Sequence, residues 1–229
     1  MTAHGLLLAF SEVGDKVPEA DYFDLCDEKN IFCRNPIPGF LSAARFKQSF
    51  NLKPTWGAVY DLTSVDNLPS DALAAAAKER TTQEVDVMSR VELVDQRLYT
   101  LKAEKSSDAY AGYKENFFFL VNSMDIDPAL EDELFKWYTE DRIPMLANVR
   151  GWLRSRLFVL TAADVSGSLG AQSPAYKKPT KFIALHEFND VVPFKSKEYE
   201  DAMSTPWSKQ IAPKLKNVGE GMFKIARAI

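Results

Sequence analysis

Apolar residues along the chain follow two spacings, one typical of strands and one typical of helices. The run Leu6-Leu7-Leu8-Ala9-Phe10 is short and continuous, which predicts a strand over 5–12. A matching apolar strand is predicted over 117–124. A helix is predicted after Pro18 in the first half and after Pro128 in the second. The second of these helices shows the i, i+4, i+7, i+8 pattern of one buried face. That face consists of Leu130, Leu134, Trp137 and Tyr138.

The two halves repeat one another. When the sequence is shifted by 112 residues, the stretch 23–46 falls on 135–158 without a gap. The identities are Phe23/Phe135, Glu28/Glu140, Ile31/Ile143, Gly39/Gly151, Leu41/Leu153 and Phe46/Phe158. The string Lys53-Pro54-Thr55 also recurs, as Lys178-Pro179-Thr180, before a strand in each half. An internal duplication explains these matches.

Both halves show the same order of elements, strand-helix-strand-strand-helix-strand. The remaining predicted strands are 40–47, 56–62 and 89–100 in the first half and 152–160, 181–188 and 219–227 in the second; the second helices are Pro69–Lys78 and Ser196–Lys214. This order predicts an α+β fold of two ferredoxin-like βαββαβ repeats, each an antiparallel sheet with both helices on one face. Because the bare face of each sheet must be covered, the sheets are expected to pack together as an intramolecular dimeric α/β-barrel.

The predicted domains are a first repeat at 1–101, a linker at 102–116 and a second repeat at 117–229. The stretch 161–177 is rich in Gly, Ser and Ala, and the first half has a much shorter turn at that point. A loop of that length is either a flexible insertion or a lid over the barrel mouth.

Composition and charge narrow the class of protein. The net charge of -4 comes with scattered Lys and Arg and no basic stripe, so nucleic acid is not an expected partner. Cys26 and Cys33 lie seven residues apart, too far for a disulfide on one helix, and are interpreted as buried reduced thiols of a cytoplasmic protein. The first apolar run is too short for a signal peptide or a membrane span, so no membrane partner is expected.

Several short strings resemble the EthD-like proteins of the dimeric α/β-barrel superfamily. They are 27–31 with 37–41 in the first half, 140–144 with Gly151-Trp152 in the second, the strand 55–62 and Thr205-Pro206-Trp207. The superfamily includes lactone isomerases, polyketide cyclases, cofactor-free monooxygenases and haem-binding relatives. Tandem EthD-like chains of this length are familiar from filamentous fungi, so the resemblance implies secondary metabolism. The family's helical histidine is replaced here by Asn30 and Arg142, which puts any mechanism based on that imidazole in doubt.

Alternate strand residues are expected to point into the barrel. With the phase implied by the resemblance to the polyketide cyclases, the inward residues are His4, Leu6, Leu8, Phe10, Trp56, Ala58, Tyr60, Phe117, Phe119, Val121, Phe182, Ala184 and His186. This lining is mainly aromatic and aliphatic and fits a small hydrophobic or aromatic substrate. The alternative is that these side chains simply fill the core.

His186 and Tyr60 are the candidate catalytic residues, because pseudo-symmetry places them at equivalent positions of the two repeats. An imidazole with a pKa near neutrality accepts a proton beside a carbonyl, and a tyrosine hydroxyl donates to the resulting enolate. A histidine hydrogen-bonded within a strand is the alternative interpretation. His4, near the N-terminus, is a weaker candidate.

Helix and strand positions supply two further sets of polar candidates. Asn30 and Arg142 are candidate substrate-binding residues; Arg142 either orients a carboxylate or phenolate or pairs with Glu140 or Asp141. Arg154 and Arg156 share one strand face, where they either line the pocket or border a protein contact.

Motifs for common cofactors are missing from the sequence. It contains no GxGxxG, Walker-type loop, HExxH or GxSxG, and it has two histidines. We therefore expect no cofactor and no metal, and haem is not expected although His186 is a conceivable axial ligand.

The leading hypothesis is a cofactor-independent cyclase, dehydratase, decarboxylase or isomerase acting on an aromatic or polyketide-like metabolite. The alternatives are a non-catalytic ligand-binding or stress-response barrel and a cofactor-free monooxygenase. The expected oligomeric state is a monomer or a homodimer, because duplication already closes the barrel.

Overall fold

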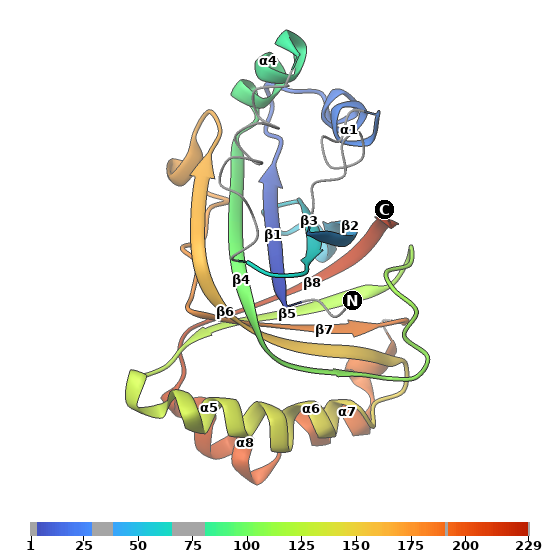
Figure 1. Cartoon of the computed structure of the whole chain (residues 1–229), viewed down its shortest axis with the longest axis vertical. Helices are drawn as coiled ribbons and strands as arrows, with labels where there is room; N and C mark the ends of the chain where they lie inside the picture. Colours follow the sequence, from blue (N-terminus) through green and yellow to red (C-terminus); the bar gives the residue numbers. More distant parts are fainter. Residues whose placement is uncertain (1–3, 29–38, 66–80, 191, 229) are drawn as a thin grey trace. The chain divides into compact units, whose positions relative to one another are not determined.

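Figure 1 shows the computed structural model, in which residues 4–28, 39–65, 81–190 and 192–228 are described. Within these ranges the strands are β1 (Gly5–Glu12), β2 (Phe40–Gln48), β3 (Trp56–Leu62), β4 (Leu93–Ser106), β5 (Phe118–Asp125), β6 (Trp152–Ser166), β7 (Phe182–Phe188) and β8 (Lys216–Ala228). The helices there are α1 (Glu19–Glu28), α4 (Thr82–Arg90), α5 (Glu131–Trp137), α6 (Ile143–Leu146), α7 (Lys197–Met203) and α8 (Pro206–Ile211), with a π-helical turn at Tyr138–Arg142.

In the first repeat, β1 pairs antiparallel with both β3 and β4, and β2 pairs antiparallel with β3. Helices α1 and α4 contribute to an apolar cluster on one face of this sheet. Its buried members are Val13, Val17, Tyr22, Trp56, Val87 and Val91. The Tyr22 hydroxyl also donates to Ser11 Oγ at 2.8 Å, so Ser11 lies on the helix-covered face.

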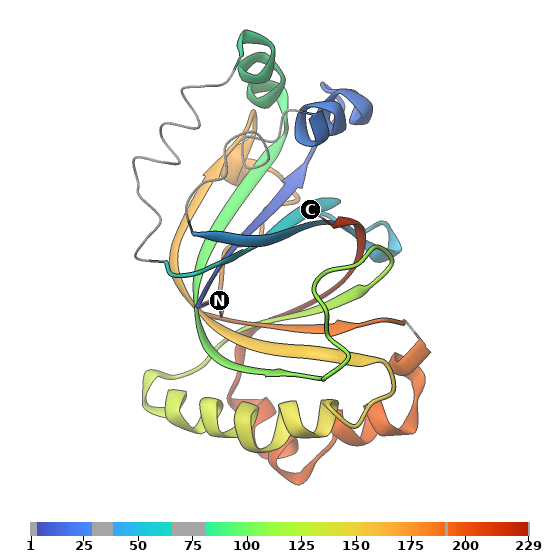
Figure 2. The same ribbon diagram turned by 45° about the vertical axis from the view of Figure 1, so that its right-hand side comes forward.

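In the second repeat, β5 lies between β7 and β8, and β6 pairs with β7, all antiparallel. Helices α5 to α8 lie on one side of this sheet, as Figure 2 shows. The apolar face predicted for α5 is confirmed, because Leu134, Trp137 and Tyr138 are buried in the core cluster between these helices and the sheet.

The strand order, β1-β3-β2-β8-β5-β7-β6-β4, is that of a closed antiparallel barrel. Each repeat contributes four consecutive strands with its helices on one face. The predicted fold class is confirmed: an α+β chain of two ferredoxin-like repeats that form a dimeric α/β-barrel.

The duplication is visible in backbone geometry. Gly39 and Gly151, identical in the sequence repeat, both have left-handed φ angles, +102° and +82°. Each glycine carbonyl accepts from the backbone N–H that follows the third strand of its repeat: Thr63 N to Gly39 O is 2.8 Å, and Asn189 N to Gly151 O is 2.9 Å. Glycine recurs because other residues rarely adopt this backbone conformation.

A β-bulge follows each of these glycines. The pairing register shifts between Phe40 and Ser42 in β2, and between Trp152 and Arg154 in β6. The extra residue reverses which face the side chains after it occupy. Trp152 and Ser155 consequently lie on the same face of the second sheet, three positions apart.

Several predicted boundaries differ from the structure. The strand predicted at 152–160 extends to Ser166, the one predicted at 219–227 begins at Lys216, and the helix predicted at Ser196–Lys214 is divided into α7 and α8. The strand predicted at 89–100 begins at Leu93, because 82–90 form α4. A capping box starts this helix: Thr81 Oγ1 accepts from the Glu84 N–H at 3.3 Å, and the Glu84 carboxylate accepts from the Thr81 N–H. β4 then extends to Ser106, into the predicted linker. The helix predicted at Pro69–Lys78 lies outside the described residues.

Residues 161–178 belong to the compact unit formed by residues 1–100, and the other unit comprises 101–160 and 179–229. The N–H of Ser168 donates to Val91 O, and those of Leu169 and Gly170 donate to Glu92 O. Arg97 Nη2 donates to Lys177 O at 2.5 Å. The segment for which the sequence allows a flexible insertion or a lid is therefore hydrogen-bonded to the turn between α4 and β4 and to β4 itself.

The strand phase predicted for the barrel interior is wrong for β3 and β7, whose predicted inward residues lie on the helix side of their sheets. Trp56 lies in the cluster with α1 and α4, and Tyr60 packs with Leu7 and Ala43 on the same face. Phe182, Ala184 and His186 lie against the helices of the second repeat. The reason is register, because the pairs Leu7↔Tyr60 and Leu120↔His186 fix the faces of β3 and β7.

We predict that a fragment of residues 1–101 does not fold cooperatively alone. It lacks 161–178, so the backbone carbonyls of Val91 and Glu92 lose the N–H partners that this segment supplies. Urea unfolding followed by circular dichroism should show no sigmoidal transition for 1–101, and adding the fragment 102–229 should restore one. A cooperative transition from 1–101 alone would show that the segment is dispensable.

Candidate functional site

His186 lies on β7, on the face that the helices of the second repeat cover. It is 1% exposed, and its Nδ1 lies 2.8 Å from Ser155 Oγ, which belongs to the neighbouring strand β6. The Trp152 Nε1–H donates to the same Ser155 oxygen at 2.8 Å. The three side chains form a short hydrogen-bonded chain inside the protein. The bulge in β6 makes it possible by bringing Trp152 and Ser155 to one face.

This chain fixes the tautomer of His186. An indole N–H only donates, so Ser155 Oγ accepts from Trp152. The Ser155 hydroxyl hydrogen then needs an acceptor, and His186 Nδ1 is the acceptor within reach among the described residues. His186 therefore carries its proton on Nε2. That nitrogen is buried and has no hydrogen-bond partner in the part of the chain that the structure describes.

Tyr138 covers His186 from the helix layer. The two rings are parallel within 10°, with centroids 6.3 Å apart, and the Tyr138 hydroxyl donates to Met124 Sδ at 3.5 Å. Tyr138 begins the π-helical turn. Pro144 follows that turn and has no N–H to continue an α-helical ladder, and such turns recur at functional sites.

Arg142 ends the π-helical turn and is half-buried. Its Nη1 donates to Ala202 O at 3.0 Å and lies 2.6 Å from Met203 Sδ, and its guanidinium carbon is 4.8 Å from the Trp137 ring centroid. No carboxylate forms an ion pair with Arg142 among the described residues. The pairing with Glu140 or Asp141 considered from the sequence is not formed.

Asp141 instead links the π-helical turn to the N-terminus of α8 through a hydrogen bond. Its Oδ2 accepts from Thr205 Oγ1 at 2.6 Å, and Thr205 Oγ1 also lies 2.8 Å from Ser208 Oγ. Trp137 Nε1 donates to Ser208 Oγ at 3.2 Å. The strings 140–144 and 205–207, which carried the resemblance to EthD-like proteins, thus meet in space and hold the π-helical turn against α8.

Burial dominates the electrostatics of this layer. Burial lowers the pKa of His186 to about 3, and the positive charge of Arg142 contributes to the decrease, so the imidazole is neutral near pH 7. Burial raises the pKa of Tyr138 to about 12 against the opposing effect of Arg142. Burial and Glu220 raise the pKa of Tyr199, which Arg142 also opposes. Arg142 is the cation common to all three groups.

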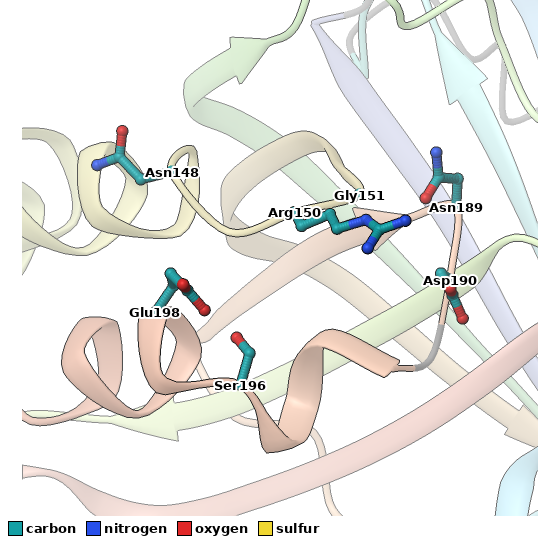
Figure 3. A pocket seen from close by; sticks show the side chains of 7 residues that line it. All are labelled: Asn148, Arg150, Gly151, Asn189, Asp190, Ser196 and Glu198. Atoms are coloured by element: carbon teal, nitrogen blue, oxygen red, sulfur yellow. The ribbon is translucent and has the colours of Figure 1, made fainter.

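A pocket of about 690 Å³, lined largely by polar residues, lies where the second repeat's strand ends meet its helices (Figure 3). Its lining comes from the turn before β6, the end of β7 and the start of α7. The lining residues are Asn148, Arg150, Gly151, Asn189, Asp190, Ser196 and Glu198. Two of the lining residues, Gly151 and Asn189, directly flank Trp152 and Phe188, which are buried in one cluster with Ala202.

The opposite face of β6 and β7 carries a buried ionic cluster. Glu187 Oε1 accepts from Arg154 Nε at 2.7 Å and from Arg156 Nη2 at 3.1 Å. Arg156 Nη2 also donates to the Tyr113 hydroxyl at 2.9 Å. The guanidinium carbon of Arg154 lies 4.1 Å from the centroid of the Tyr110 ring. Arg154 and Arg156 therefore share one face, as the sequence indicates, and residues of the predicted linker contact both of them.

The remaining predicted site residues are spread over the chain. Ser11 lies on one face of the first sheet, and Leu6, Leu8 and Phe10 lie on the other. Phe119, on β5, is paired with Glu187 of the neighbouring strand β7. Val121 shares the face of Phe119, Phe117 precedes β5, and His4 is exposed. Ala58 shares the helix-side face of Tyr60 and Trp56. Asn30 lies outside the described residues.

The two proposed catalytic residues occupy equivalent positions, as expected, but in unlike surroundings. Ser155↔His186 in the second repeat corresponds to Ala43↔Tyr60 in the first, where both residues belong to an apolar cluster. Sequence reasoning missed Ser155, Trp152 and Tyr138 as partners of His186. A bulge-dependent serine has no signal in the sequence, although Tyr138 is visible in the helix pattern.

Known structures share this fold. No protein-family profile matches the sequence, and no curated protein matches it. An anthrone oxidase-like protein superposes with a TM-score of 0.65 at 12% identity, over 100% of this chain and 93% of its own. A candidate monooxygenase from Fusobacterium nucleatum gives 0.58 at 12% identity, over 100% and 95%. A major regulator of staphylococcal pathogenesis gives 0.55 at 12% identity, over 97% and 99%. These matches establish the fold, which hosts several functions.

We predict that nitrogen NMR will show His186 as the neutral Nε2–H tautomer from pH 5 to pH 8. The hydrogen-bonded chain Trp152–Ser155–His186 imposes this tautomer. In Ser155→Ala the His186 ring should remain neutral but no longer prefer the Nε2–H tautomer. A wild-type signal from the Nδ1–H tautomer, or a titration near pH 6.5, would contradict the assignment.

We also predict an acid-dependent loss of stability that depends on His186. Its folded-state pKa lies below the ordinary value of 6.5, so below pH 6.5 the unfolded chain binds a proton that the folded chain excludes. Stability should fall as the pH decreases from 6.5 towards 3, by roughly 2 kcal/mol between pH 7 and pH 5 from this group. Urea unfolding at pH 5, 6 and 7 gives the free energy of unfolding at each pH. This free energy should change less with pH in His186→Asn than in the wild-type protein. His4→Gln, at an exposed position, serves as the control and should show the same change of unfolding free energy with pH as the wild-type protein.

Proposed function

We propose that this protein is an enzyme that binds a small aromatic or polyketide-like molecule between the second sheet and its helices. His186 acts there as a neutral hydrogen-bond donor to an oxygen that becomes negatively charged during the reaction. The observation that carries this proposal is the buried Nε2–H of His186, which has no acceptor among the described residues. A buried donor without a partner destabilises the folded chain by about 1–3 kcal/mol, and a ligand oxygen would remove that cost.

A donor role fits His186 better than the role of a base. An imidazole with a pKa of about 3 is too weak a base to take a proton from a carbon acid near pH 7. A neutral imidazole with a fixed N–H instead stabilises a developing oxyanion without any change of charge on the protein. The Ser155 and Trp152 side chains hold that N–H in place before the ligand binds.

Two reaction classes use such a donor. The first is enolate chemistry without a cofactor, which includes cyclisation, dehydration, decarboxylation and isomerisation of a polyketide-like compound. The second is cofactor-free oxidation of an electron-rich aromatic enolate by dioxygen. The names of two structural neighbours, an anthrone oxidase-like protein and a candidate monooxygenase, favour this second class as an alternative.

The pocket provides a route for the ligand in this proposal. Its volume of about 690 Å³ falls in the range of ordinary ligand pockets. Its Ser196 and Glu198 belong to the start of α7, whose last residues Ala202 and Met203 contact Arg142.

We predict that His186→Leu lowers turnover of 1,8-dihydroxyanthrone by about 10²–10³-fold, the usual effect of removing an oxyanion donor. Oxygen uptake and product mass, measured together, distinguish oxidation from rearrangement. His186→Gln, which keeps a terminal N–H donor, should retain more activity. Tyr60→Phe is the matched control and should leave turnover unchanged, because Tyr60 packs in the apolar cluster of the first repeat. Unchanged turnover in His186→Leu would remove the proposed role.

A further inference from the structure

Arg142 is a cation to which none of the described residues supplies an anionic partner. Its hydrogen-bonding contacts are a backbone carbonyl and a thioether, at 3.0 Å and 2.6 Å, and neither neutralises its charge. The carboxylate next to it in sequence, Asp141, is held by Thr205. A half-buried guanidinium without a carboxylate favours any anion that reaches its surroundings.

A continuous series of rings connects Arg142 to His186. The guanidinium carbon lies 4.8 Å from the Trp137 ring centroid, and the Trp137 and Tyr138 centroids are 4.7 Å apart. Tyr138 in turn stacks on His186 at 6.3 Å. Trp137, Tyr138 and His186 are each at most 2% exposed. Water is largely excluded from this layer, so a positive charge at one end acts more strongly on a charge at the other than it would in solution.

We propose that Arg142 determines specificity by making the site bind its ligand as an anion. The substrate class is then an acidic phenol or an enolised 1,3-dicarbonyl compound. The inference rests on the proposed function, because it assumes that the ligand oxygen lies at His186 Nε2. Arg142 supplies a permanent charge, whereas the family's histidine at the equivalent helix position would be charged only below its pKa.

A purely structural role for Arg142 predicts different behaviour. Arg142 joins the π-helical turn to α7 through Ala202 and Met203, so its loss would lower stability whether or not a ligand feels its charge. Arg142→Lys keeps the charge and loses most of the contacts, and Arg142→Gln loses the charge and keeps a donor. Lys136→Gln, at an exposed position of α5, removes the same charge from the same helix layer and is the matched control.

The experiment uses emodin, a hydroxyanthraquinone whose phenolate absorbs at longer wavelength than its phenol, and its tri-O-methyl ether, which cannot ionise. Visible absorption titrations give the affinity for each probe and the ionisation state of bound emodin. Wild type and Lys136→Gln should bind emodin at least tenfold more tightly than the ether and hold it as the phenolate. Arg142→Lys should keep this preference, and Arg142→Gln should lose it while urea midpoints show that both variants are folded.

The outcomes separate this inference from the proposed function. If wild type binds both probes equally, or binds emodin as the neutral phenol, the role of Arg142 is wrong while the aromatic site stands. An Arg142→Gln variant with the wild-type preference would also overturn it. If wild type binds neither probe, the proposed function fails and the inference fails with it. The ionisation state of emodin bound to the wild-type protein tests the inference even if Arg142→Gln does not fold, because emodin bound as the neutral phenol would overturn it.

Discussion

The register of β6 against β7 decides what the second repeat presents on each face of its sheet. One bulged residue between Trp152 and Arg154 shifts the pairing so that Ser155 lies opposite His186. Trp152, Ser155 and His186 then face the helices, and Arg154, Arg156 and Glu187 face the other way. Without the bulge, Trp152 would share a face with Arg154 and the hydrogen-bonded chain could not form. The positive φ angle of Gly151 makes room for this irregularity at the start of the strand.

The sequence predicts the strands of this protein well and their faces poorly. Strand positions follow from apolar runs and from the repeat, and β1 and β3 have the predicted limits. Facing requires the register between strands, which depends on bulges and turn geometry that a single strand does not reveal. On this incomplete basis the sequence predicts Trp56 and His186 in the interior, whereas both pack against helices. The fold class survives because it depends on the order of elements alone.

The site was only partly predictable for a related reason. His186 is noticeable because the chain has two histidines, and Arg142 because it replaces a residue of a familiar helical string. Their partners come from positions with no distinctive pattern: a strand serine, a helix tyrosine and the backbone carbonyl of Ala202. Burial then determines the protonation state of His186, because it lowers the pKa of the imidazole. A histidine that looks like a base in the sequence is a neutral donor once it is buried beside a cation.

The unlike surroundings of Ser155–His186 and Ala43–Tyr60 have a consequence for symmetry. A barrel assembled from two identical subunits must carry every residue twice, so a substitution that creates a polar site also introduces buried polar groups into the other copy. In a single chain with two repeats, a substitution in one repeat leaves the other repeat unchanged. Here the first repeat keeps an apolar pair where the second keeps a hydrogen-bonded one. One repeat can therefore keep its apolar packing while the other contains buried polar groups.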